Sequence, residues 1–257
     1  MNMITAHPHR SRTASIAAVL TTLAAGWLIA TPSAEAKPRC FGKPATVVGT
    51  NGKDRLKGSP GRDVIVARGG NDSVSSGPGK DLMCGDGGND LLRSGHGRDK
   101  LDGGPGDDEV HGADDSDLLV KGGTGDDFCD GQRGSDDKLV CGPGNDLLLG
   151  GTTASGGPGD DEIQSYGGVV DGGPGDDEID NQFSNETQID GGAGADQITG
   201  SFLPDVIRGG PDDDDLFGLD GDDMLFGDDG NDDLDGGPGT DTCDQGTGTG
   251  AILACEL

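Results

Sequence analysis

The sequence predicts an all-β chain, a right-handed parallel β-roll (β-solenoid) built from stacked nonapeptide half-coils. Two regularities carry this prediction. An aspartate recurs every nine residues over long stretches, and a large apolar residue follows two positions after it. The 52 glycines and an aromatic content of only 3% fit many tight turns around a thin core, and they do not fit an ordinary globular domain.

The first 36 residues differ from the rest and predict a secretory signal peptide. A basic start precedes an apolar run over 16–30, and the small-x-small pattern Ala34-Glu35-Ala36 follows. The apolar run is short for a membrane span. We therefore expect cleavage after Ala36, a secreted, extracellular mature chain, and no transmembrane anchor in that chain.

A cap segment over 37–45 leads into a first regular block of repeats over 46–120. With the aspartate numbered 6, position 4 is glycine in every unit but one, and position 8 is always large and apolar. A disordered acidic tail would not keep three chemically distinct positions in register. The aspartates of this block are Asp54, Asp63, Asp72, Asp81, Asp90, Asp99, Asp108 and Asp117. The apolar residues are Leu56, Ile65, Val74, Met83, Leu92, Leu101, Val110 and Leu119.

The repeat loses its strict period over 121–190 and regains it over 191–250. In the irregular region we expect a weak unit around Asp137 and bulges or loops at 152–156, 165–170 and 181–188. Its aspartates are Asp127, Asp146, Asp161 and Asp177. The second regular block supplies Asp196, Asp205, Asp214, Asp223, Asp232 and Asp241. Gly250 takes the next aspartate position, and residues 251–257 form a C-terminal cap.

Positions 1 to 6 of each unit predict a turn, and positions 7 to 9 predict a short strand. Pro-Gly recurs at positions 3 and 4, as in Pro78-Gly79 and Pro105-Gly106, and suits a type II turn. A single half-coil cannot bury its apolar face, so half-coils must stack, two to each coil. Roughly eleven coils at about 4.8 Å each predict a rod about 50 Å long.

Charge points to a cation as the partner of these turns. Asp and Glu number 48 against 18 Lys and Arg, a net charge of −30, which argues against nucleic acid as a partner. Stacked coils bring like carboxylates to within about 5 Å in two rows, which is unfavourable without a cation between them. Carboxylates combined with turn carbonyls in a flexible loop suit Ca2+ better than Mg2+. We expect multiple calcium ions, with the eighteen aspartates named above as the metal ligands.

Six cysteines in an exported chain favour disulfides. Cys129/Cys141 and Cys243/Cys255 share a separation of twelve residues, which makes local bridges plausible. Cys40 and Cys84 then pair by default. Six cysteines allow fifteen connectivities, and this set is one of them.

The repeat GGxGxDxUx, in which U is a large apolar residue, resembles the calcium-binding repeat of hemolysin-type (RTX) proteins. The resemblance covers most of 46–250. Good copies are GGPGDDEVH at 103, GGPGDDEIQ at 156, GGPGDDEID at 172 and GGAGADQIT at 191. It implies that the aspartates are side-chain ligands and that turn carbonyls complete each site. Many RTX proteins use a C-terminal export signal, and the N-terminal signal predicted here departs from that pattern.

Three classes of function are compatible with this sequence. We favour a secreted, non-catalytic calcium-binding protein that folds on binding Ca2+ and acts as a cell-surface, matrix or adhesion element. The alternative is an accessory or targeting RTX module that serves a secreted enzyme such as a protease or lipase, although neither HExxH nor GxSxG occurs. A calcium buffer or folding aid is the third class. The sequence names no protein or surface partner.

Overall fold

The computed structural model describes residues 36–113, 115–132, 137–181 and 186–256. The chain divides into two units, residues 1–36 and 37–257, and only the second is described below. The predicted signal peptide lies outside the described residues, apart from Ala36. In the described part of the chain, no helix is long and apolar enough to cross a membrane.

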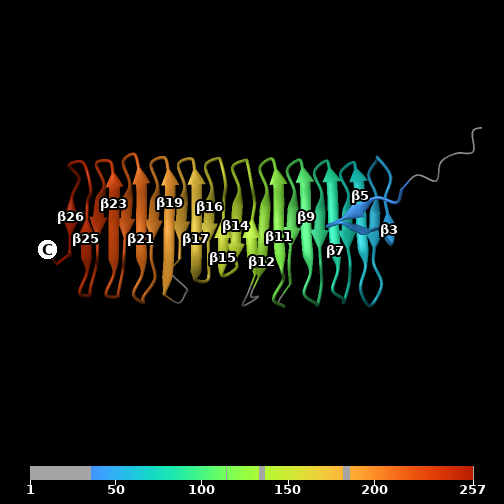
Figure 1. Cartoon of the computed structure of the whole chain (residues 1–257), viewed down its shortest axis with the longest axis horizontal. Helices are drawn as coiled ribbons and strands as arrows, with labels where there is room; N and C mark the ends of the chain where they lie inside the picture. The colour runs from blue at the N-terminus through green and yellow to red at the C-terminus, as the bar shows by residue number, and fades with distance from the viewer. Residues whose placement is uncertain (1–35, 114, 133–136, 182–185, 257) are drawn as a thin grey trace, which may run out of the picture. The chain divides into compact units, whose positions relative to one another are not determined.

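The described residues of the second unit form two parallel sheets of twelve strands each, and neighbours within a sheet are strands two apart along the chain (Figure 1). We name them the odd sheet and the even sheet after their strand numbers. The odd sheet contains β3 (Val47–Val48), β5 (Val64–Gly69), β7 (Leu82–Gly87), β9 (Lys100–Pro105), β11 (Leu119–Thr124), β13 (Lys138–Val140), β15 (Thr153–Ser155), β17 (Gly168–Pro174), β19 (Thr187–Ala193), β21 (Val206–Pro211), β23 (Met224–Asp229) and β25 (Thr242–Asp244). The even sheet contains β4 (Arg55–Lys57), β6 (Ser73–Ser75), β8 (Leu91–Arg93), β10 (Glu109–His111), β12 (Phe128–Gln132), β14 (Leu147–Gly150), β16 (Glu162–Gln164), β18 (Glu178–Asp180), β20 (Gln197–Thr199), β22 (Asp215–Phe217), β24 (Asp233–Asp235) and β26 (Ile252–Leu253).

The chain alternates between the sheets, so successive strands form the two walls of each coil, as a parallel β-roll requires. The predicted fold class is confirmed. Most even strands have the expected three residues, whereas most odd strands extend into the following turn, as β5 and β7 do. Most strands point one large apolar side chain into the space between the sheets, β15 contributes Ala154, and these side chains form a single thin core. Its largest fully buried members are Ile65, Met83, Leu92, Leu101, Leu139, Leu148, Ile163, Ile179, Ile198, Ile207, Leu216 and Leu225.

Irregular spacing in the sequence is absorbed mainly by changes in coil length. Ile163 pairs with Leu148 and with Ile179, so two successive coils are shorter than the regular coil of the terminal blocks. Residues 152–156 and 165–170, expected to be bulges or loops, instead contain β15 and the start of β17, and Ala154 and Val170 are buried in the core. That expectation was wrong for 153–155 and 168–170, which form strands because both walls of a coil shorten together and keep the strands paired, whereas 165–167 lie outside the strands. Of the third stretch, residues 182–185 lie outside the described part.

The inward position of β11 also differs from the prediction. Val120 is fully buried and pairs with Leu101, whereas Leu119, the predicted core residue, is only half-buried. One extra residue between Asp117 and the strand causes the shift. Leu118, immediately after Asp117, is 45% exposed and bulges outward.

The cap segment over 37–45 forms an antiparallel hairpin, β1 (Arg39–Cys40) with β2 (Lys43–Pro44). It packs on the outer side of the odd sheet, where Cys40 and Ala45 join a second apolar cluster with Val64, Val66 and Leu82. Disulfides link Cys40–Cys84, Cys129–Cys141 and Cys243–Cys255, which confirms the expected connectivity.

Candidate metal-binding rows

Every predicted ligand lies in one of two rows of aspartates, each at the point where a turn enters a strand. The even row precedes the even sheet without a gap and consists of Asp54, Asp72, Asp90, Asp108, Asp127, Asp146, Asp161, Asp177, Asp196, Asp214 and Asp232. The odd row precedes the odd sheet and consists of Asp63, Asp81, Asp99, Asp117, Asp137, Asp205, Asp223 and Asp241. Asp137 was not among the predicted ligands, because the lengthened coils around it conceal its place in the repeat.

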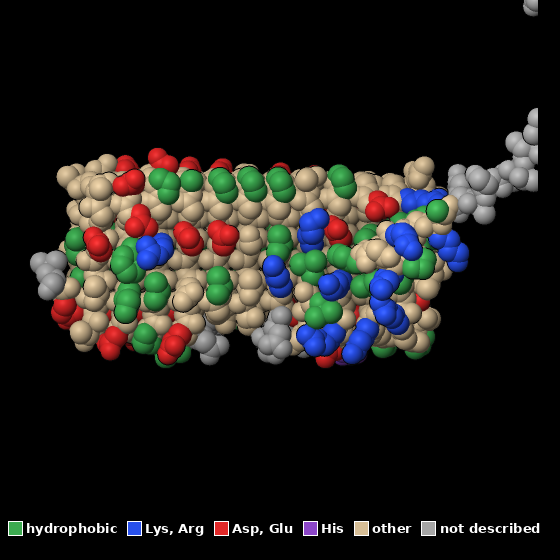
Figure 2. All heavy atoms as spheres, in the orientation of Figure 1, with side chains coloured by type: hydrophobic (Ala, Val, Ile, Leu, Met, Phe, Trp, Pro, Cys, Tyr) green, Lys and Arg blue, Asp and Glu red, His purple; other side chains and the backbone are tan. Residues whose placement is uncertain are grey.

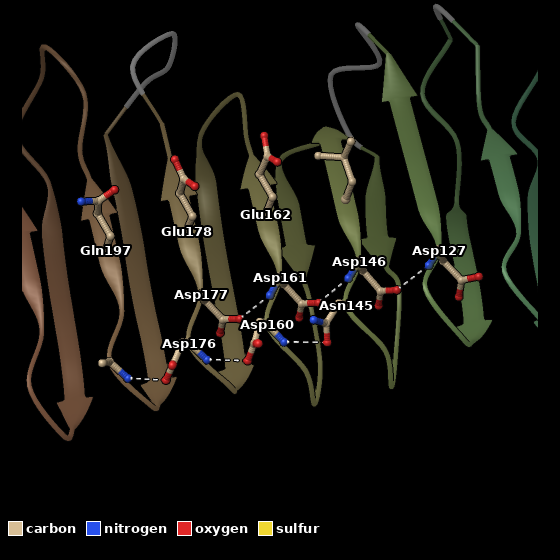
Figure 3. Close-up of a pocket in the computed structure, with 12 residues that line it drawn as sticks. Asp127, Asn145, Asp146, Asp160, Asp161, Glu162, Asp176, Asp177, Glu178 and Gln197 are labelled. Carbon is tan, nitrogen blue, oxygen red and sulfur yellow. Dashed lines mark hydrogen bonds between the residues drawn. The ribbon is translucent and has the colours of Figure 1, made fainter.

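Aspartates in adjacent coils are joined by a repeated hydrogen bond. The backbone N–H of one aspartate donates to Oδ1 of the aspartate in the next coil, at 2.7 Å from Asp72 to Asp90 and 2.8 Å from Asp161 to Asp177. Figure 3 shows these bonds along the even row from Asp127 to Asp177. Asp137 belongs to the odd row because its Oδ1 accepts the N–H of Asp117. The backbone thereby fixes the position and orientation of each carboxylate.

The second oxygen of these carboxylates has no such partner. Oδ2 is buried and makes no hydrogen bond in fifteen aspartates, and these oxygens face the interior of the turn. The residues are Asp72, Asp81, Asp90, Asp99, Asp108, Asp117, Asp127, Asp146, Asp161, Asp177, Asp196, Asp214, Asp223, Asp232 and Asp241. A buried anionic oxygen without a partner is costly, and so regular a set of them indicates turns that are built to hold a positively charged group.

Burial also raises the pKa of many of the row aspartates when no ion is present. Desolvation raises the pKa of Asp161 to about 8 and of Asp108 to about 7, and neighbouring carboxylates add to the rise against the opposing backbone hydrogen bond. Asp63 is an exception. Desolvation acts to raise the pKa of Asp63 as well, but hydrogen bonds from Ser59 and Thr46 outweigh that effect, and the pKa is lowered.

The donor set near each free oxygen fits calcium. A Cβ placed on Gly172 would lie 2.4 Å from Oδ2 of Asp177 and 2.4 Å from the backbone carbonyl oxygen of Gly191 in the next coil. Gly103 stands in the same relation to Asp108 and Gly122, at 2.3 and 2.5 Å. Carboxylate and carbonyl oxygens therefore converge beside the first glycine of the repeat, and an all-oxygen set is what Ca2+ prefers. No three His, Cys, Asp or Glu side chains group as metal ligands within the described ranges, so an ion there needs backbone oxygens.

The odd row is interrupted in the middle of the roll. Strand pairing places Thr152, Gly168 and Thr187 where aspartate stands in other coils. Thr187 still donates its N–H to Oδ1 of Asp205. The hydrogen bond between adjacent coils is therefore present at this position, although Thr187 itself supplies no carboxylate. The three coils of β15, β17 and β19 therefore carry aspartates on the even edge alone.

Polar side chains close both ends of the odd row. The Thr46 hydroxyl lies 3.2 Å from Oδ1 of Asp63, and Oε2 of Glu256 accepts the N–H of Asp241 at 2.6 Å. Glu256 was not predicted, because it lies outside the repeat and takes the aspartate's role by proximity alone. Among the described residues, the even row has no equivalent carboxylate after Asp232, as the glycine at position 250 predicts.

Comparison with known families also indicates calcium as the ion for these repeats. The RTX calcium-binding nonapeptide repeat model (4 copies) matches residues 48–83, 85–119, 120–137, 188–207 and 208–243, more than half of the chain. The chain belongs to the RTX repeat family. Calcium binding is therefore implied for its repeats. No curated protein matches the chain. The stretch between 137 and 188, which the family model does not match, contains the shortened coils and the break in the odd row of this RTX roll.

Substituting Gly172 by alanine is expected to destabilise the calcium-bound roll by about 2–3 kcal/mol, because the new methyl group overlaps Oδ2 of Asp177 and a backbone carbonyl. Urea denaturation in calcium measures the effect. Gly87→Ala is the matched control, since Gly87 also lies in an odd strand and a Cβ added there would meet no atom within 4 Å. Equal losses in the two variants would contradict the steric account.

In calcium-free buffer, acid is expected to favour the folded roll. A carboxyl whose pKa is higher in the folded than in the unfolded chain binds protons more tightly when folded. This stabilisation is complete below the unfolded aspartate pKa of about 3.9. It disappears as the pH rises through the folded values, about 6 for Asp90 and about 8 for Asp161. Circular dichroism in EGTA should show β-structure growing as the pH falls from 8 to about 5, and a flat profile would be incompatible with buried, unpaired carboxylates.

Proposed function

We propose that the two aspartate rows bind a series of Ca2+ ions between adjacent coils and that the chain folds on binding them. The single observation that carries this proposal is the set of fifteen buried Oδ2 atoms without a partner. Each bound ion would take carboxylate oxygens from the rows and carbonyl oxygens from the turns. The eighteen predicted aspartates and Asp137 are the proposed ligands.

Charge and packing both support folding on binding. The chain carries a net charge of −30, and its core receives at most one large side chain from most strands. Self-repulsion of that size opposes a compact state, and so thin a core supplies little to offset it. Calcium is the group that would supply the missing stabilisation.

The role we propose is that of a secreted, non-catalytic structural element at the cell surface, in a matrix or in adhesion. The three disulfides support an oxidising compartment outside the cytoplasm. The N-terminal apolar segment and its Ala34-Glu35-Ala36 pattern support export through a cleaved signal peptide. The buried carboxylates are accounted for as ligands, and this use of them supports a structural over a catalytic role.

Expression of the full chain in a secretion-competent host tests the export part of the proposal. We expect the extracellular fraction to contain a protein whose measured mass corresponds to a chain that begins at Lys37 and has all six cysteines oxidised. Retention of the uncleaved chain inside the cell would overturn it. A surface or matrix role further predicts that washing with EGTA releases the protein from cells, whereas washing with an equal ionic strength of NaCl does not.

A further inference from the structure

Five cations gather in one groove at the N-terminal end of the odd edge. Arg62, Lys80 and Arg98 precede three consecutive aspartates of the odd row, and Lys100 and Lys43 complete the lining beside Phe41, Leu82 and Leu118. Lys100 lies 5.7 Å from the ring centre of Phe41. We call this the basic groove. Its five cations form no ion pair with any described carboxylate, although the chain as a whole is strongly acidic.

Calcium binding does not explain these cations. Arg62, Lys80 and Arg98 each adjoin an odd-row aspartate, so their charge opposes a divalent cation bound there. At the same position of the repeat on the even edge, the first unit has Lys53, and the later units have no cation there, as Asn89 and Asp107 illustrate. The cations therefore point to an anionic partner outside the calcium sites.

A second groove, on the even edge, has the opposite charge. It has a volume of about 600 Å³ and runs over the coils of β12 to β20, with Asp160, Asp176, Glu162 and Glu178 exposed along it (Figure 3). We call this the acidic groove. Its side chains occupy the residues just before and just after each row aspartate, the positions that Arg98 and Lys100 occupy in the basic groove.

Charge is also divided along the chain. Arg208 is the only Lys or Arg after residue 138, whereas 28 Asp and Glu follow that residue. Figure 2 shows Lys and Arg gathered over the N-terminal coils and almost absent from the remainder of that face. The molecule thus has a positive patch at one end and a long negative surface elsewhere.

We propose that the basic groove of one molecule binds the acidic groove of a second copy of this chain. Strand pairing fixes the coil spacing of every β-roll at about 4.8 Å, so rows with one charge per coil match in period along their whole length. An anionic partner that is not built of stacked strands does not share that repeat by construction. Because the two grooves are different surfaces, the contact is heterologous, and each pair retains one free groove of each kind for further growth.

The proposal rests on calcium-dependent folding, because the grooves exist only in the stacked coils. Each bound Ca2+ also adds two positive charges, which lowers the repulsion between acidic molecules. Exposed ion pairs are individually weak, so we expect association at high protein concentration and sensitivity to salt.

Sedimentation velocity on the full mature chain tests the proposal, in about 5 mM CaCl2 and at about 20 or 300 mM NaCl. We expect the mass to rise with concentration in low salt and to fall to that of the monomer in high salt. Lys80→Glu/Arg98→Glu and Glu162→Lys/Glu178→Lys should each abolish this rise. Mixing the two variants should restore association, because one retains the acidic groove and the other the basic groove. Lys53→Glu/Lys57→Glu makes the same charge change at the same end of the roll, but on the even edge and outside the basic groove. This variant should associate like the unaltered chain.

Several results would overturn the proposal. These are a monomer at every concentration, association that survives reversal of the basic groove, or no restoration on mixing. Binding of a linear polyanion such as heparin to Lys80 and Arg98 without self-association would also overturn it and assign the groove to a polyanion. Circular dichroism of the same calcium-loaded samples separates the two failures: a monomer with full β-signal contradicts self-association alone, whereas an unfolded chain contradicts the proposed function.

Discussion

Chelating calcium at pH 7.5 is expected to unfold the β-roll, with loss of its β-sheet circular dichroism signal and a large increase in hydrodynamic radius. The buried row aspartates would then have to remain charged without a cation, or to bind protons at a pH above most of their shifted pKa values, which are about 7 for Asp99 and about 6 for Asp117. At pH 7.5 most of them would therefore be charged and buried without a counter-ion, which opposes the stacking of the coils.

The expected effect is large because many sites act together. One site at ten times its dissociation constant adds only about 1.4 kcal/mol. A series of coupled sites exceeds the 5–15 kcal/mol or so by which a typical domain is stable. The transition should be reversed by Ca2+ and not by Mg2+ at the same concentration, since Mg2+ demands a tighter octahedron. The disulfides must be intact throughout, so that loss of structure reports calcium alone. A β-signal that persists in EGTA at this pH would contradict calcium-dependent folding.

Asp161→Asn is expected to give the largest effect of any single ligand substitution. Asp161 lies in the middle of the even row, beside coils whose odd edge has Thr152 and Gly168 in place of aspartate. Losing its carboxylate leaves its own coil without a charged ligand on either edge, between Asp146 and Asp177 of the adjacent coils. We expect the calcium concentration at half-folding to rise at least about tenfold, equivalent to about 1.4 kcal/mol. A calcium titration followed by circular dichroism measures it.

Asp160→Asn is the matched control for this substitution. Asp160 is adjacent and exposed, and its Oδ1 accepts the N–H of Asp176 outside the row. Asparagine retains that acceptor and removes the same charge, so a charge effect alone would move both variants equally. Asp108→Asn changes a coil with aspartates on both edges. It should raise the calcium concentration at half-folding by less than Asp161→Asn and by more than Asp160→Asn. If Asp160→Asn raises the calcium concentration at half-folding as much as Asp161→Asn does, the row aspartates are not the calcium ligands.

Much of this architecture could be predicted from the sequence because each repeat position has one physical task. The period of aspartates such as Asp72 and Asp90 gives the coil, and the apolar residue two positions later gives the core. The connectivity of Cys129 and Cys141 was also predictable, since the coil brings residues twelve apart to opposite walls.

The errors arise where local spacing does not determine pairing. Leu119 and Val120 are both apolar, and only the bulge at Leu118 decides which of them points inward. The shortened coils over 139–179 depend on both walls changing length together, a long-range condition that no single unit encodes. Asp137 and Glu256 join the odd row through contacts across coils, and Glu256 has no repeat motif to indicate its role.

Locating the ions tests the central claim most directly. Anomalous diffraction from crystals of the calcium-loaded chain should show peaks along both aspartate rows. The even row should be continuous from Asp54 to Asp232, and the odd row should have a gap between Asp137 and Asp205, where Thr152, Gly168 and Thr187 replace the ligand. A folded roll without peaks beside the aspartates, or with peaks filling that gap as densely as the rest, would contradict the assignment of the rows as the calcium sites.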